Sequence, residues 1–176
     1  MSNIISGVPG HNVKNVIIHD VMLINHSKGV VIKNLDKIPE NLKGYPENRM
    51  FGQELPASGF YIRHAENIKL ENISLQCAFG EHRPFLVADE VKMLQLDDAG
   101  ITKTDSTVYS TVFRLRNVNQ VAITPPFFLP EYKTLIQVEG NGTKDINLYM
   151  KEKIEKYKLI TYSNDIKERN LLTVFP

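Results

Sequence analysis

The strongest constraint on this chain is a pattern of apolar residues that recurs about every 26 residues. Around Ile68, apolar side chains lie 8, 6 and 3 residues before and 2, 5 and 7 residues after this anchor. A closely similar pattern surrounds four further anchors, the last with only its first half: Val16, Leu94, Val121 and Ile146. The anchors are separated by 52, 26, 27 and 25 residues, and a step of 52 equals two periods. Repeats of this length predict a protein built from stacked, similar units.

Within each repeat the apolar residues alternate with a period of two, which is typical of β-strands. Polar pairs interrupt the alternation at equivalent positions and predict bends: His19-Asp20, Glu71-Asn72 and Asp97-Asp98. A unit of this kind buries its inward face only by stacking on its neighbours. We therefore expect an all-β fold, a right-handed parallel β-helix with coils of about 26 residues, the hand following from the preference for right-handed parallel crossovers. Two inward ladders are expected, formed by Val16, Ile18, Ile68, Leu70, Leu94, Leu96, Val121 and Ile123.

A β-sandwich is the alternative fold. Its turn signals come every 8 to 12 residues without long-range register. Antiparallel pairing between residues 66–76 and 92–102 would favour it over the β-helix.

The step of 52 residues indicates that one coil either carries a long insertion or contains a degenerate repeat. Proline and glycine recur through residues 33–57, and they oppose both helix and central strand. We expect an ordered loop that packs on the flank of the β-helix. Its apolar anchors are predicted to be Tyr45, Met50, Phe51 and Leu55.

The repeat ends after Leu148, because Lys151 and Lys153 occupy positions where core residues are expected. Residues 1–148 are therefore predicted to form the coils and residues 149–176 a C-terminal cap. Helix-like spacing is seen over 150–157, and residues 171–175 are expected to add a last strand. The first coil lacks a covering segment and presents unpaired strand edges, which predicts fraying or self-association and indicates that the chain begins inside a longer β-helix.

Charge and composition exclude several partners. Lysine and arginine number 21 against 20 acidic residues, so the formal charge of +1 provides no long-range field for nucleic acid. No apolar run approaches the length of a membrane span, and the first residues lack the features of a signal peptide. Cys77 is the only cysteine, so no internal disulfide forms, and its position at a strand end favours packing over reactivity.

Several motifs resemble one known family over about residues 4–102. The segment Gly7-Val8-Pro9-Gly10-His11, the triplets Tyr45-Pro46-Glu47 and Leu55-Pro56-Ala57, and the run Gly59-Phe60-Tyr61-Ile62-Arg63-His64 carry the resemblance. They resemble the C-terminal part of bacterial polygalacturonase-like proteins, glycoside hydrolase family 28. The resemblance implies a right-handed parallel β-helix acting on pectic polysaccharide by inverting hydrolysis, with no metal or organic cofactor. It also implies that a full-length parent protein is secreted or periplasmic.

The catalytic motifs of this family are absent from the sequence. Asn-Thr-Asp, Gly-His-Gly and Arg-Ile-Lys do not occur, and the single Asp-Asp pair, Asp97-Asp98, follows the family-like loop instead of preceding it. The resemblance therefore implies that this chain contains no catalytic residues and that the hydrolytic coils precede Met1. The bend carboxylates have a second interpretation as an acid and a base: Asp20 and Asp98 lie two coils apart, or about 9.6 Å at about 4.8 Å per coil, and Glu71 lies one coil from Asp97. The simpler interpretation is that acidic and amide residues favour bends.

Three cationic residues are candidates for binding an acidic polysaccharide: Arg63, His64 and Arg83. The arginine fork pairs well with carboxylates, although a solvated rim explains the same residues. No histidine or cysteine set has metal-ligand spacing, so no metal is expected. Two functions remain open: the C-terminal portion of a pectin-degrading hydrolase without the chemistry, or a non-catalytic β-helix that binds a saccharide or a partner chain. An open reading frame upstream of Met1 that encodes the missing motifs would favour the first.

Overall fold

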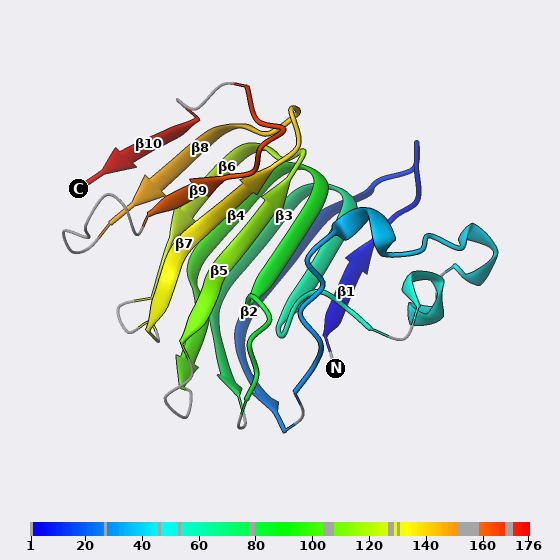
Figure 1. The fold of residues 1–176 in the computed structure, drawn as a ribbon, viewed down its shortest axis with the longest axis horizontal. Coiled ribbons are helices and arrows are strands. Elements are labelled where there is room, and N and C mark those ends of the chain that lie inside the picture. The colour runs from blue at the N-terminus through cyan, green and yellow to red at the C-terminus, as the bar shows by residue number, and fades with distance from the viewer. Residues whose placement is uncertain are drawn as a thin grey trace.

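The computed structural model is an all-β parallel β-helix (Figure 1). It describes residues 2–26, 28–45, 47–52, 54–77, 80–103, 108–126, 129, 131–150, 159–167 and 171–176. The strands of this part are β1 (Asn3–Ser6), β2 (Val13–Asn25), β3 (Phe60–Cys77), β4 (Leu86–Lys103), β5 (Tyr109–Arg116), β6 (Asn119–Thr124), β7 (Tyr132–Glu139), β8 (Lys144–Tyr149), β9 (Ile160–Tyr162) and β10 (Leu172–Phe175). No helix in the described residues is long and apolar enough to cross a membrane.

Every pairing between these strands is parallel, and residues 66–75 pair in register with residues 92–101 before a shift that pairs Gln76 with Lys103. The β-sandwich is therefore wrong and the parallel β-helix is confirmed. Each rung adds one residue to every ladder, so identical positions of successive coils stack. The first ladder runs through Val16, Ile68, Leu94, Val121, Ile146 and Leu172, and the second through Ile18, Leu70, Leu96, Ile123, Leu148 and Val174.

The predicted inward ladders form the core. Their central members, such as Leu70 and Leu96, are buried, whereas Val16 and Ile18 are half-buried because they lie on the first rung. Core side chains of neighbouring coils also meet face to edge, as do the rings of Phe60 and Phe85, whose centroids are 5.9 Å apart. The 26-residue period therefore corresponds to one layer of this core.

Bends occur at three stacked positions of the coil, each held by residues with positive φ. The predicted bend contains Asp20, Asn72 and Asp98, with φ between 49° and 57°. Acidic and amide residues adopt this left-handed conformation more readily than most others. Two further bends were not predicted. One contains Asn15, Asn67, Met93, Gln120 and Asp145, and the other contains His64, Glu90, Asn117 and Gly140.

The step of 52 residues is an insertion without a hidden coil, because β2 pairs directly with β3. Three short 3-10 helices lie in it, η1 (Leu35–Lys37), η2 (Leu42–Gly44) and η3 (Asn48–Phe51). The insertion lies beside β1 in Figure 1. Its apolar side chains form a second cluster with Tyr61 of β3 and Val87 of β4. The members from the insertion are Leu35, Ile38, Met50, Phe51, Leu55 and Ala57. The ordered, packed loop is thus confirmed.

One of its four predicted anchors is wrong. Met50, Phe51 and Leu55 are buried, and Phe51 meets the ring of Tyr61 edge to face at 5.2 Å. Tyr45 is half exposed instead. It follows the turn of η2, and its main-chain N–H bonds back to the carbonyl of Leu42, which directs the chain outward at this point.

The C-terminal segment continues the coil stack. β9 pairs with β7, and β10 pairs with β8, both in parallel and in register. The predicted last strand is therefore confirmed as Leu172–Phe175. The helix-like spacing falls mostly on residues 151–158, which lie outside the described residues. The division of the chain into coils and cap stays a prediction.

Candidate functional site

The candidate cations Arg63, His64 and Arg83 hold the insertion onto the coils. Arg63 and His64 both contact Glu40 of the insertion, at 3.2 Å from Nη2 and 2.7 Å from Nε2. His64 Nδ1 also lies 2.9 Å from Glu90 Oε2. Because both ring nitrogens face carboxylate oxygens, only the imidazolium form donates to both. His64 is 4 % exposed and Glu40 is 16 % exposed, so the contact between these two side chains is largely shielded from water.

Arg83 belongs to the same arrangement and is 4 % exposed. Its Nε and Nη2 donate to the carboxylate of Glu81 at 2.9 and 2.6 Å, and its Nη1 donates to the carbonyl of Leu55 at 3.1 Å. Gly29 lies directly against the guanidinium, where a Cβ atom would stand 2.2 Å from Cζ. The planar group is thus enclosed on the side of Gly29 as well as at its edge.

Arg114 and Arg116 complete the contacts with the insertion. Arg114 donates to the carbonyls of Ile32 and Lys33 at 2.6 and 2.7 Å, and Arg116 pairs with Asp36. We call the five residues Arg63, His64, Arg83, Arg114 and Arg116 the insertion clamp. Each of Arg63, His64 and Arg83 is already paired with a carboxylate of this chain. Their role in substrate contact stays a prediction.

A ladder of alternating charge runs through the clamp. The register places Arg63, Asp89, Arg116 and Glu139 on successive rungs. Asp89 has no exposed side-chain surface and accepts two hydrogen bonds from Arg116, at 2.7 and 2.6 Å. The hydrogen bonds that Arg116 donates to Asp89 raise the pKa of Arg116 above its usual value. A hollow of about 630 Å³ beside this ladder is lined by three cations and four carboxylates, so it does not favour an anionic ligand: Lys33, Arg63, Arg116, Asp36, Glu90, Glu139 and Asp165.

Two of the bend carboxylates, Asp20 and Glu71, have structural partners. Asn72 Nδ2 donates to Asp20 Oδ1 at 2.6 Å, and Glu71 stands one rung from Asp97. The hydrogen bond from His19 is the main cause of a lowered pKa at Asp20. Among the described carboxyls whose pKa departs from the usual value, all are lowered: Asp20, Glu66, Glu81 and Asp165. A general acid requires the opposite shift.

A polar groove lies on the outer face of the sheet that contains β2, β3, β4, β6 and β8. Its first wall is the unpredicted bend with Asn15, Asn67, Met93, Gln120 and Asp145, whose left-handed backbone occurs at the same position in each coil. Asn67 Nδ2 donates to Asn15 Oδ1 at 2.7 Å, which ties two rungs of this wall together. The stacked bend therefore carries a row of mainly polar side chains along the β-helix axis.

The floor of this groove is the ladder two residues further along each strand. It consists of Ile17, Lys69, Gln95, Ala122, Asn147 and Thr173, which the strand register aligns. One hollow of about 710 Å³ covers the C-terminal rungs and another of about 270 Å³ covers the N-terminal rungs. Both are lined by Gln120 and Ala122, so they adjoin at these two residues. We call the two hollows together the sheet-face groove.

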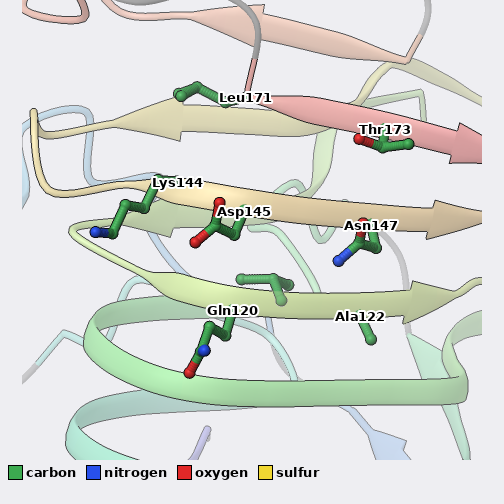
Figure 2. A pocket seen from close by; sticks show the side chains of 8 residues that line it. Gln120, Ala122, Lys144, Asp145, Asn147, Leu171 and Thr173 are labelled. Atoms are coloured by element: carbon green, nitrogen blue, oxygen red, sulfur yellow. The ribbon is translucent and has the colours of Figure 1, made fainter.

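Figure 2 shows the C-terminal part of this groove, where Gln120, Lys144 and Asp145 project from neighbouring strands on the same side. Ala122 and Asn147 lie further along those strands, and Thr173 lies on the neighbouring strand β10. Amide side chains both donate and accept hydrogen bonds, so this surface suits a ligand rich in hydroxyl groups. Ala122 is the smallest residue of the floor and lines both hollows.

Charge in the sheet-face groove is nearly balanced. Lys69 and Lys144 are its cations and Asp145 is its anion. Lys69 bonds Glu71 at 2.7 Å, which raises the pKa of Lys69, whereas Lys144 forms no ion pair with another described residue. Sequence reasoning missed this groove, and the signal that marks it is the repetition of Asn, Gln or Asp immediately before the ladder anchors.

No group of three or more potential metal ligands occurs among the described residues. The fold and the groove together define a parallel β-helix with a polar groove along its axis. Comparison with known proteins adds no narrower class: no family model matches the chain, and neither a curated protein nor a solved structure matches it.

Proposed function

We propose that this chain binds a polysaccharide of the pectic or other acidic type along the sheet-face groove, as a non-hydrolytic part of a polygalacturonase-like glycosidase. The observation that carries the proposal is the position of two neighbouring hollows, both lined by Gln120 and Ala122, along one face of the coil stack. From the rung of Ile17 to that of Thr173 the floor spans five coil steps, or about 24 Å at about 4.8 Å each.

The chemistry of the groove supports an extended chain of sugars. A polymer with a regular repeat can present similar groups to successive rungs, and amides at Asn67, Gln95, Gln120 and Asn147 can exchange hydrogen bonds with its hydroxyls. Exposed apolar patches, such as that of Met93, suit the C–H faces of sugar rings. Sites of this kind obtain affinity from many modest contacts instead of a few strong ones.

Acidic sugars are favoured by the available cations. Lys144 extends into the groove and Lys69 lies on its floor, while the arginines of the insertion clamp are already paired inside the protein. Attraction between an exposed lysine and a sugar carboxylate is screened by salt. The pectic substrate itself comes from the resemblance to glycoside hydrolase family 28.

Hydrolysis is not proposed for this chain, because inversion needs a protonated carboxyl opposite a carboxylate base. Asp20 and Asp98 instead adopt the left-handed conformation of a bend, and Asp20 is bonded to Asn72. Purified protein should therefore release no reducing ends from polygalacturonate above buffer. Activity that disappears in Asp97→Asn or Asp98→Asn protein would contradict this part of the proposal.

Binding is tested by titrating galacturonate oligomers into the protein in a calorimeter at low and at high salt. Ala122→Trp fills the junction of the two hollows, and we expect it to weaken binding by about tenfold or more, the equivalent of one or two lost hydrogen bonds. Ser110→Trp is the matched control, since Ser110 is exposed on β5 and does not line the groove. Binding that is absent, that survives Ala122→Trp, or that is lost equally in the control would overturn the proposal.

A further inference from the structure

The turn between β7 and β8 contains an asparagine followed by a glycine. It runs from Gly140 to Thr143 and is closed by a hydrogen bond from the Thr143 N–H to the Gly140 carbonyl at 3.1 Å. Asn141 and Gly142 are both exposed, and Asn141 is the only asparagine in the sequence that precedes a glycine. The Asn141 side chain makes no hydrogen bond to another described residue. Its amide carbon is therefore accessible.

This pair of residues can react without any enzyme. The main-chain nitrogen of a glycine is not shielded by a side chain of its own. After losing its proton to a base, this nitrogen can attack Cγ of the preceding asparagine. A C–N bond forms, the amide group takes up a proton and leaves as ammonia, and the product is a cyclic succinimide. One water molecule then opens the ring at either carbonyl and leaves an aspartate in a normal or an isomerised main chain.

The coils protect the asparagines inside the strands from this reaction. Asn147 lies in β8, whose main chain is paired with β6 and β10, so the next nitrogen cannot turn back onto the side chain. Asn67 and Asn72 precede Ile68 and Ile73, whose branched and buried side chains crowd the attacking nitrogen. The turn at Asn141 lacks both kinds of protection.

One contact restrains the glycine of the turn. Asn117, on the neighbouring rung, accepts a hydrogen bond from the Gly142 N–H at its Oδ1, with a distance of 3.2 Å. This distance is at the long end of the normal range. A Cβ atom at Gly140 would stand 2.2 Å from the same Oδ1, so the Asn117 side chain fills the space beside the turn. The Gly142 nitrogen must leave Asn117 before it can attack Asn141.

We propose that Asn141 is a site of spontaneous deamidation, and that Asn117 sets the rate by holding the Gly142 nitrogen. Conversion of the amide to a carboxylate lowers the formal charge of the chain from +1 to 0. The new charge arises just before β8, close in sequence to Lys144 of the sheet-face groove. The reaction itself is independent of saccharide binding.

Mass spectrometry tests the proposal after the folded protein has been incubated in heavy-oxygen water at neutral and at mildly alkaline pH. Digestion in ordinary water with trypsin, which cleaves after Lys133 and Lys144, releases residues 134–144, in which Asn141 is the only asparagine. This peptide should gain one heavy oxygen and contain isoaspartate. Labelling should be faster at the higher pH, because the attacking nitrogen must lose its proton. The peptide that contains Asn147 should stay unlabelled.

Three variants complete the test, each verified as folded by circular dichroism. Asn141→Gln is the matched control and should stay unlabelled, because its longer side chain closes a ring far more slowly. Asn117→Gly removes the acceptor but keeps a residue that tolerates the φ of 52° at this position, and it should speed labelling by about fivefold, the equivalent of one lost hydrogen bond. Asn117→Asp keeps an acceptor oxygen and should react like the unmodified protein.

Three results would overturn the proposal. The first is a folded protein that stays unlabelled under conditions in which a synthetic peptide of residues 134–144 is labelled. The second is labelling that persists in Asn141→Gln protein, since the reaction would then lie elsewhere in the peptide. The third is an equal rate in Asn117→Gly and unmodified protein, which would show that Asn117 does not restrain the turn.

Discussion

Replacing Asp89 by asparagine should destabilise the protein by about 3–5 kcal/mol, the usual result of removing one partner from a buried ion pair. The Asp89 side chain has no exposed surface, and it lies between Arg116, at 2.6 and 2.7 Å, and Arg63, at 3.4 Å. The Arg63 and Arg116 side chains are only 11 % and 14 % exposed. Asparagine keeps the shape of the side chain but leaves two largely buried guanidinium groups without their shared counter-charge.

Asp36→Asn provides a control on the same arginine. Arg116 also pairs with Asp36, whose side chain is 79 % exposed. Exposed pairs contribute at most about 1 kcal/mol, because water screens the charges and both side chains lose freedom. The two substitutions therefore remove the same chemical group from the same partner, and burial is the main difference between them.

Urea unfolding followed by circular dichroism measures the difference. With a slope of about 2 kcal/mol per M, a loss of 3–5 kcal/mol lowers the midpoint by roughly 1.5–2.5 M, whereas Asp36→Asn should lower it by less than about 0.5 M. The slopes must agree between variants, because repeat proteins can lose two-state behaviour. A loss below about 1 kcal/mol in Asp89→Asn, or equal losses in the two variants, would refute the assignment of the charge ladder as a structural element.

Two further predictions concern stability. Burial raises the pKa of Tyr61 to about 12. The neutral Tyr61 side chain therefore contributes its full stability below about pH 10, and this contribution is lost as the pH rises from 10 to 12. Urea unfolding should show that Tyr61→Phe protein loses less stability than the unmodified protein over that interval, and equal losses would contradict this. Leu70→Ala opens a cavity in the middle of a ladder and should lower the free energy of unfolding by about 2–5 kcal/mol. Val16→Ala on the half-buried first rung should lower it clearly less. A similar loss for both variants would show that the first and the central rungs are packed alike.

The ladders could be predicted because one physical rule generates them. Stacked coils place equal positions above each other, so the spacing of apolar residues around Ile68 also assigns the partners of Leu94 and Val121. The bend at Asn72 was equally accessible, since asparagine and aspartate favour the left-handed conformation. The bend at Met93 was not, because methionine has no such preference and its conformation follows from the coils stacked on either side.

The partners of the cations could not be predicted from the repeat. Glu40, Asp36 and the carbonyl of Leu55 lie in the insertion, which has no periodicity, and they reach cations 24 to 80 residues away in the chain. Nothing in the sequence distinguishes an arginine that awaits an anionic ligand from one that already holds a loop. The resemblance to a polysaccharide-degrading family favoured the first interpretation for Arg63 and Arg83.

The outer surface of the β-helix thus has two parts, one that stabilises the fold and one that is proposed to bind ligand. Beside the insertion, the outward side chains Arg63, Asp89 and Arg116 are bonded to one another and to the loop, so substitutions there should change the free energy of unfolding. Along the sheet-face groove, Gln120 and Lys144 extend into solvent on a backbone that the inward ladders already hold. Substitutions there should change ligand affinity and leave the unfolding midpoint nearly constant. A groove variant that lost stability and affinity together would show that this surface also supports the coil, and binding could then no longer be separated from folding.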